Sequence, residues 1–93
     1  MRLIEFTNAF KRDFKREAKE QYGTVLLTDF PVIVQTLALD QPLPPAKRDH
    51  ALNGEWCDHR DCHIKPDLVL IYRKPDDMRL QLVRLGSHSE LGL

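Results

Sequence analysis

The chain lacks the features that mark membrane, secreted or strongly charged proteins. Its longest uninterrupted apolar run is Leu68–Tyr72, far shorter than a signal peptide or a membrane span requires. It has 14 basic and 14 acidic side chains, so any nucleic-acid site must be a local patch. Two cysteines without an export signal should stay reduced. We expect a soluble, cytoplasmic protein that makes no membrane contact.

The chain also has no internal repeat and no low-complexity segment. With 93 residues it is too short to bury two separate hydrophobic cores. We therefore expect one domain over residues 1–93.

Hydrophobic spacing in the first part of the chain predicts a short strand over residues 2–6 and then two helices. Phe10 and Phe14 begin an apolar series with helical spacing, Thr7 offers an N-cap and Gly23 a stop, so the first helix should cover 8 to about 21. Thr28 followed by Pro31 predicts the start of a second helix that runs to about Leu39. The two helices should form a hairpin.

The period then changes to that of strands. Residues 59–64, 67–74 and 79–86 are rich in branched and aromatic side chains, and the turn signals Lys65-Pro66 and Pro75-Asp76-Asp77 separate them. This pattern predicts a three-stranded antiparallel meander. With the helix hairpin covering one face of the sheet, the fold class is α+β, a two-layer sandwich.

All four histidines lie between residues 50 and 88. Histidine can take and give a proton near neutral pH and is also the commonest metal ligand. On a strand, Asp61 and His63 would share one face while Cys62 and Ile64 point to the other. Asp67 opens the next strand and could approach His63. A site that combines imidazoles with carboxylates is therefore expected here.

His50 and His88 should join this site from flanking loops, with positive charge from Arg60, Lys65 and Arg84. No serine or cysteine lies in an obvious nucleophile motif. The set suits RNA cleavage by the substrate's own 2′-hydroxyl, which needs a base, an acid and cations that neutralise the phosphorane. This chemistry requires no metal or other cofactor.

The first predicted helix carries cations at helical spacing. They form two rows, Lys11, Lys15 and Lys19 in one and Arg12 and Arg16 in the next. Such rows are typical of a solvated surface, but they could also follow a phosphate backbone. The helix alone does not select between the two.

A competing interpretation takes Cys57, His59, Cys62 and His63 as zinc ligands. The residue types fit, but structural zinc sites usually separate their ligand pairs by a longer loop. Cys62 and His63 would also point to opposite faces of a strand. A small zinc-binding module remains the less favoured alternative.

Three runs of the sequence together resemble the YafQ-type toxins of the RelE/ParE superfamily. They are Arg48-Asp-His50-Ala-Leu-Asn-Gly54-Glu-Trp56, Arg60-Asp-x-His63-x-x-Pro66-Asp67-x-x-Leu70-Ile71-Tyr72 and Arg84-x-Gly86-Ser-His88. The resemblance implies a RelE-like sandwich and a toxin that cuts messenger RNA in the ribosomal A site. It places catalytic roles on His50, His63, His88 and Asp67, supporting or phosphate-binding roles on Asp61, Arg60, Arg84 and Lys65, and the cationic helix against ribosomal RNA. Which histidine acts as base and which as acid stays open.

The resemblance also implies partners. They are a cognate, DinJ-like antitoxin, which with the toxin represses their operon by binding operator DNA, and the ribosome with its 16S rRNA and messenger. One departure is the tail Ser89-Glu-Leu91-Gly-Leu93, where the family usually has an aromatic that stacks on a messenger base. Relatives on the same fold include ParE-like gyrase inhibitors without catalysis, a further alternative, although inhibition by binding needs no imidazoles beside carboxylates.

Overall fold

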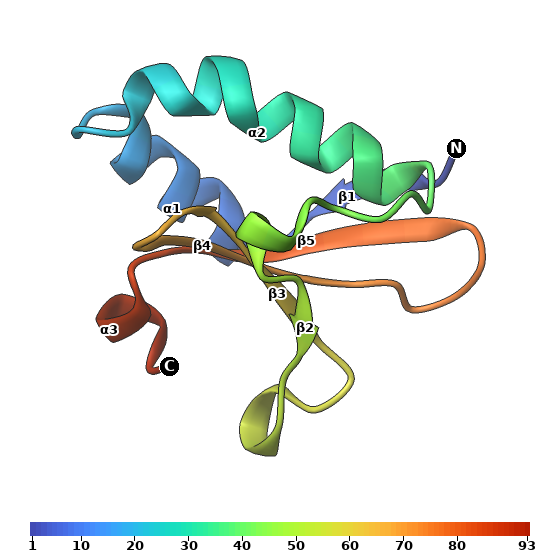
Figure 1. Ribbon diagram of the computed structural model, residues 1–93. Coiled ribbons are helices and arrows are strands. Elements are labelled where there is room, and N and C mark those ends of the chain that lie inside the picture. Colours follow the sequence, from blue (N-terminus) through green and yellow to red (C-terminus); the bar gives the residue numbers. More distant parts are fainter.

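The computed structural model describes residues 1–93 as a five-stranded sheet with two helices across one face (Figure 1). The strands are β1 (Leu3–Phe6), β2 (His50–Ala51), β3 (Arg60–Lys65), β4 (Leu68–Arg73) and β5 (Arg79–Gly86). The helices are α1 (Asn8–Ala18), α2 (Gly23–Ala38) and α3 (His88–Leu91), with single 3₁₀ turns at Pro45–Lys47 and Gly54–Trp56. The predicted α+β class, with an N-terminal strand, a helix hairpin and an antiparallel meander, is confirmed.

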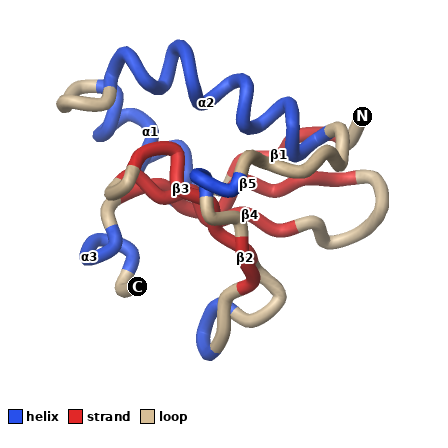
Figure 2. Tube along the Cα trace, viewed as in Figure 1, coloured by secondary structure: helices blue, strands red, loops and turns tan.

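The sheet has the order β1-β5-β4-β3-β2 (Figure 2). Neighbours from β2 to β5 are antiparallel, whereas β1 pairs with β5 in parallel over four residues. A register shift between Ile71 and Tyr72 of β4 leaves Val83 of β5 as an extra residue. The N-terminal strand thus forms the edge of the sheet beside β5.

Helix α1 begins as the sequence predicts, because the Thr7 side chain accepts a hydrogen bond from the Phe10 N–H at 3.0 Å. It ends at Ala18, earlier than the predicted 21. The chain turns sharply after Ala18, which brings Gly23 so close that a Cβ on it would lie 2.8 Å from the Ala18 carbonyl oxygen. Glycine is therefore required at this turn by close approach of the backbone.

The predicted start of the second helix at Thr28 is wrong. Helix α2 begins at Gly23, and Pro31 lies inside it. Pro31 lacks the N–H that would bond the Leu27 carbonyl, and both residues are exposed, so the helix loses this bond on its solvent side. The buried stripe of α2 outweighs that loss.

Most of the hydrophobic core lies between the helix pair and the inner face of the sheet. It includes Phe10, Phe30 and Leu37 from the helices and Cys62 and Tyr72 from the strands. A smaller cluster on the outer face joins Val69 and Ile71 to Leu91 of α3. None of the helices is long and apolar enough to cross a membrane.

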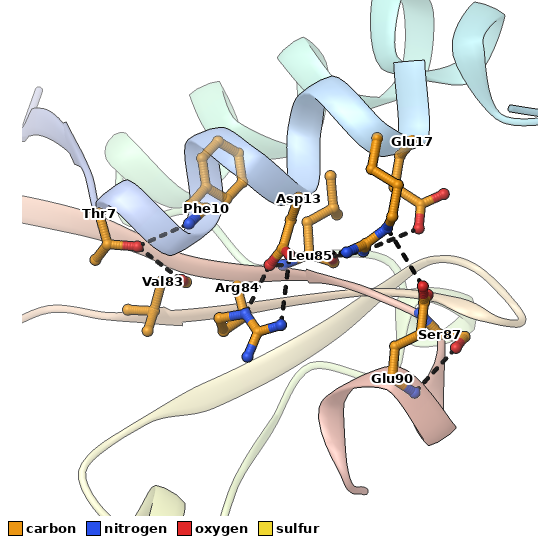
Figure 3. A network of polar contacts seen from close by, with 10 residues as sticks. Thr7, Phe10, Asp13, Glu17, Val83, Arg84, Leu85, Ser87 and Glu90 are labelled. Carbon is orange, nitrogen blue, oxygen red and sulfur yellow. Dashed lines mark hydrogen bonds and ion pairs between the residues drawn. The ribbon is translucent and has the colours of Figure 1, made fainter. Parts of the chain in front are cut away.

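Beyond the end of β1, the backbone of β5 is hydrogen-bonded by side chains of α1 and of its N-cap (Figure 3). Thr7 donates its hydroxyl to the Val83 carbonyl, Asp13 accepts the Leu85 N–H at 3.0 Å, and Arg16 donates to the Leu85 carbonyl at 2.9 Å. Backbone groups that would face an open edge are thus satisfied by a helix. This arrangement fixes the strand that leads into α3.

Candidate active site

The candidate site is a depression of about 600 Å³ where β3, the turn after it, the 3₁₀ turn at Pro45–Lys47 and α3 meet. The residues that line it are Ala46, Lys47, Arg48, His63, Ile64, Lys65, Pro66 and His88. It therefore combines two imidazoles with three cationic side chains.

Strand β3 brings Asp61 and His63 to the same face. Cys62 and Ile64 between and after them are fully buried in the core under the helices, as the strand period predicts. Asp61 is itself buried, at 2% exposure, whereas His63 is partly exposed. Burial raises the pKa of Asp61, and the neighbouring histidines only partly offset this effect.

His50 reaches Asp61 from strand β2, where the two residues are register partners. The His50 Nδ1 atom lies 3.0 Å from Asp61 Oδ1 and 2.8 Å from the Arg48 carbonyl oxygen. Because a carbonyl only accepts, the bond to Arg48 places a hydrogen on Nδ1 and leaves Nε2 free. Asp61 Oδ1 makes no well-aligned hydrogen bond, so its link to His50 is electrostatic.

His88 lies at the start of α3, which a capping box between Ser87 and Glu90 holds in place. Its Nδ1 atom lies 2.8 Å from Asp67 Oδ1, and its backbone N–H donates to the same oxygen at 3.1 Å. Both hydrogen bonds lower the pKa of Asp67. The sequence led us to expect that Asp67 approaches His63. Instead, the Asp67 carboxylate bonds His88 of α3.

The rings of His63 and His88 meet edge to face, with centroids 4.9 Å apart. Burial lowers the pKa of His63 and outweighs the raising effect of Asp61, while His88, Arg48 and His50 lower it further. Together the five residues form a continuous series, His50, Asp61, His63, His88 and Asp67. We call this series the histidine–carboxylate row.

Two cations of the depression, Lys47 and Arg48, come from the segment just before His50. Lys47 Nζ also donates to the Ile64 carbonyl at 3.1 Å, and Arg48 lies exposed at the rim. They are not among the predicted site residues, because nothing in the sequence distinguishes them from a solvated loop. Lys65, which the sequence did select, lines the depression and pairs with Asp29 at 3.2 Å.

Arg60 and Arg84, the two arginines that the sequence predicts in the site, do not line the depression. Arg84 pairs with Asp13 of α1, with its Nε atom 2.6 Å from Oδ2. Arg60 donates to Asp49 at 3.2 Å. Both guanidinium groups are therefore held by carboxylates.

The cations of α1 belong to the helix layer, on the other side of the sheet from the histidines (Figure 1). Lys11, Arg12, Lys15 and Lys19 are exposed. Arg16 is different, because it bonds Asp13, Glu17 and the Leu85 carbonyl. The first helix and its C-cap residue Lys19 thus present four free cations rather than five.

The four zinc ligands considered from the sequence do not come together. Cys62 is fully buried, and burial strongly raises the pKa of its thiol, whereas Cys57 is exposed. Nowhere in the chain are three or more His, Cys, Asp or Glu side chains grouped so that they could hold a metal ion.

The fold defines a class, since solved structures that share it include bacterial toxins. A copper-bound mutant toxin from Helicobacter pylori superimposes with a TM-score of 0.85 and 38% identity over 98% of this chain and 99% of that one. The toxin in a DinJ-YafQ complex from Escherichia coli superimposes with a TM-score of 0.82 and 31% identity over 98% of both chains.

Sequence comparison names the family. A model described as "Bacterial toxin of type II toxin-antitoxin system, YafQ" matches residues 2–92. The mRNA interferase toxin YafQ of Escherichia coli K12 is 34% identical over 92 residues, which cover 97% of this chain and 95% of the relative. The chain belongs to the YafQ family of toxins of type II toxin–antitoxin systems.

Proposed function

We propose that this toxin is an endoribonuclease that cuts translated messenger RNA in the ribosomal A site. The name of the Escherichia coli relative, an mRNA interferase, supports the activity. The observation that carries the chemistry is the pair His63 and His88, whose rings meet beside three cations in one depression. Such a pair can supply a base and an acid to one phosphodiester.

His63 is the proposed base. Its lowered pKa keeps the imidazole neutral at neutral pH, so the ring can take the proton of the 2′-hydroxyl as that oxygen attacks the adjacent phosphorus. The bond from phosphorus to the 5′-oxygen then breaks, and the 2′-oxygen remains bonded to phosphorus as a cyclic phosphate.

His88 is the proposed acid, which protonates the leaving 5′-oxygen. The Asp67 carboxylate accepts from its Nδ1 and stabilises the imidazolium, which leaves Nε2 to deliver the proton. His50 faces Asp61 with its own Nε2 free and is proposed to contact the substrate from the β2 side.

Lys47, Arg48 and Lys65 are the proposed phosphate contacts, since they already line the depression. Neither Arg60 nor Arg84 lines the depression, and Arg84 would also have to leave the buried carboxylate of Asp13, which is costly. Leu91 is buried against the sheet and the tail has no aromatic residue, so messenger bases are proposed to stack elsewhere.

A DinJ-like antitoxin is the proposed protein partner, and the DinJ-YafQ complexes of Escherichia coli support it. The ribosome with its 16S rRNA and messenger, and operator DNA bound together with the antitoxin, complete the proposed set. No step of the proposed reaction uses a metal.

The test is primer extension on a translated messenger with purified toxin, with and without ribosomes and with EDTA. His50→Ala and His88→Ala are the test variants, and His59→Ala is the matched control, because that ring contacts Trp56 and lies outside the row. Cuts that need ribosomes, survive EDTA, vanish in the test variants and persist in His59→Ala are expected. A folded wild-type toxin that makes no cuts but inhibits gyrase supercoiling would overturn the proposal.

A further inference from the structure

Asp49 stands between two residues of the candidate site, Arg48 and His50, but its side chain points to the opposite face of the sheet. There its Oδ1 atom accepts the Tyr72 hydroxyl at 2.6 Å and the Arg60 Nε–H at 3.2 Å. Tyr72 is 1% exposed and belongs to the core of the inner face. A buried phenol needs a hydrogen-bond partner, and Asp49 supplies it from the loop.

Apart from the bond between Lys47 and the Ile64 carbonyl, few contacts hold the segment around Asp49. Strand β2 pairs only two residues with β3, and β2 is an edge strand. Arg48 adopts a left-handed backbone conformation with φ of 49°, which side-chain-bearing residues rarely take. Such a conformation persists where surrounding contacts impose it.

We propose that Asp49 and Tyr72 form a latch that positions Arg48 and His50 in the candidate active site. Asp49 and Tyr72 are positioning residues and do not touch the substrate. The latch holds the Arg48 carbonyl where it accepts the His50 Nδ1–H at 2.8 Å, and so keeps Nε2 of His50 free. It also turns the Arg48 side chain toward the depression.

The inference rests on the proposed function for its effect on cleavage, but not for its effect on the His50 ring. Tyr72→Phe removes the hydroxyl and keeps the ring in the core. Tyr22→Phe is the matched control, since Tyr22 packs against the same core without a hydroxyl contact. Two quantities are measured in each protein, ribosome-dependent cleavage as kcat and KM, and the ¹⁵N shifts of the imidazoles of His50 and His88.

In Tyr72→Phe we expect kcat/KM to fall on the order of tenfold to a hundredfold, because small displacements of a catalytic group cost that much. The His50 ring should lose its single Nδ1–H tautomer and average between the two, while His88, held by Asp67, keeps its shifts. Tyr22→Phe should change none of these. A merely structural role for Tyr72 would lower the stability and leave the His50 tautomer unchanged.

Asp49→Ala provides a second route, because that side chain is partly exposed and its removal leaves the Tyr72 ring itself in the core. It should reproduce the tautomer averaging and the loss of cleavage. The latch is overturned if a folded Tyr72→Phe or Asp49→Ala protein keeps the His50 tautomer of the wild type. Absence of cleavage by the wild type would instead overturn the proposed function, and the tautomer measurement would still decide on the latch.

Discussion

Each of two candidate catalytic histidines has one ring nitrogen occupied and one free. In His50 the Nδ1 atom donates to a backbone carbonyl, and in His88 it meets the Asp67 carboxylate. Nearby hydrogen bonds thus select the tautomer before a substrate arrives. His88 shares a hydrogen bond with a carboxylate whose negative charge would stabilise the protonated ring, whereas the carboxylate near His50, Asp61, makes no aligned hydrogen bond to it.

Asp67→Asn should therefore lower kcat by about tenfold to a hundredfold, because the amide can accept from His88 but carries no charge to stabilise an imidazolium. Ribosome-dependent cleavage measures this effect. Asp58→Asn is the matched control, since Asp58 is exposed and makes no side-chain hydrogen bond or ion pair. Equal loss of activity in both variants would contradict the assigned role.

The pH profile should report the lowered pKa of His63. Burial favours the neutral ring, so the base form persists to lower pH than in a free histidine, whose pKa is about 6.5. We expect the acidic limb of the kcat/KM profile to have its midpoint below about 6.5, and an NMR titration of His63 to agree. A midpoint above that value in both measurements would exclude His63 as the base described here.

At the scale of elements, α1 and α3 meet through charged side chains at the end of β5 (Figure 3). Arg16 Nε lies 3.3 Å from Glu90 Oε2 of α3, while its other nitrogens bond Asp13 and the Leu85 carbonyl. A Cβ at Gly86 would lie 3.0 Å from Arg16 Nη2, so glycine leaves room for this contact. The helix layer thereby supports the short helix that carries His88.

Asp13 is the most buried member of this contact. Burial alone would raise its pKa, but hydrogen bonds from Arg84 and from the Leu85 N–H outweigh burial and lower it. Asp13→Ala should lower the free energy of unfolding by about 3 kcal/mol, since it leaves a buried N–H and two guanidinium groups without their partner. Urea denaturation at neutral pH measures this loss.

The control for Asp13→Ala is Arg12→Ala on the exposed side of the same helix, which should change the stability by less than about 0.5 kcal/mol. The pH dependence of the stabilisation by Asp13 follows from the lowered pKa of its carboxyl group. The stabilisation by Asp13 is present above its unfolded pKa of about 3.9 and is lost as the pH falls through its folded pKa. A difference between Asp13→Ala and wild type that grows on acidification would contradict this account.

At the scale of the whole molecule, the sheet separates two surfaces. The histidine–carboxylate row lies on the outer face, and the free cations of α1 lie in the helix layer (Figure 1). A neutral molecule can still bind RNA when its positive charge gathers on one surface, because screening confines each charge to its neighbourhood.

If α1 contacts ribosomal RNA, the double variant Lys11→Gln/Lys15→Gln should weaken ribosome binding. It should also reduce the slope of log affinity against log salt concentration by about one to two. The double variant Gln21→Glu/Gln41→Glu changes the net charge equally at exposed positions outside this helix and serves as control. Ribosome co-sedimentation over a range of salt measures both. Equal behaviour of the two variants would show that net charge, rather than the α1 surface, controls binding.

Some of these features follow from local chemistry that can be recognised in the sequence. Thr7 caps a helix by bonding a neighbour three residues away, and strand alternation places Asp61 and His63 opposite Cys62. Strand β2 and helix α3 were not predicted, because two residues of strand and four of helix are too few to show a period. The capping box of Ser87 and Glu90 is a local signal for the start of α3, whereas β2 forms where His50 meets Asp61 of a distant segment.

The sequence by itself determined the α+β class, the capped first helix, the meander and the residue types of the site, because period, capping and turn signals act between near neighbours. Only the tertiary structure decided which carboxylate meets which histidine, that Pro31 lies inside a helix, and that Arg84 is held by Asp13. Each of those outcomes is a balance between burial, hydrogen bonding and charge among residues far apart in the chain, so no local pattern encodes it.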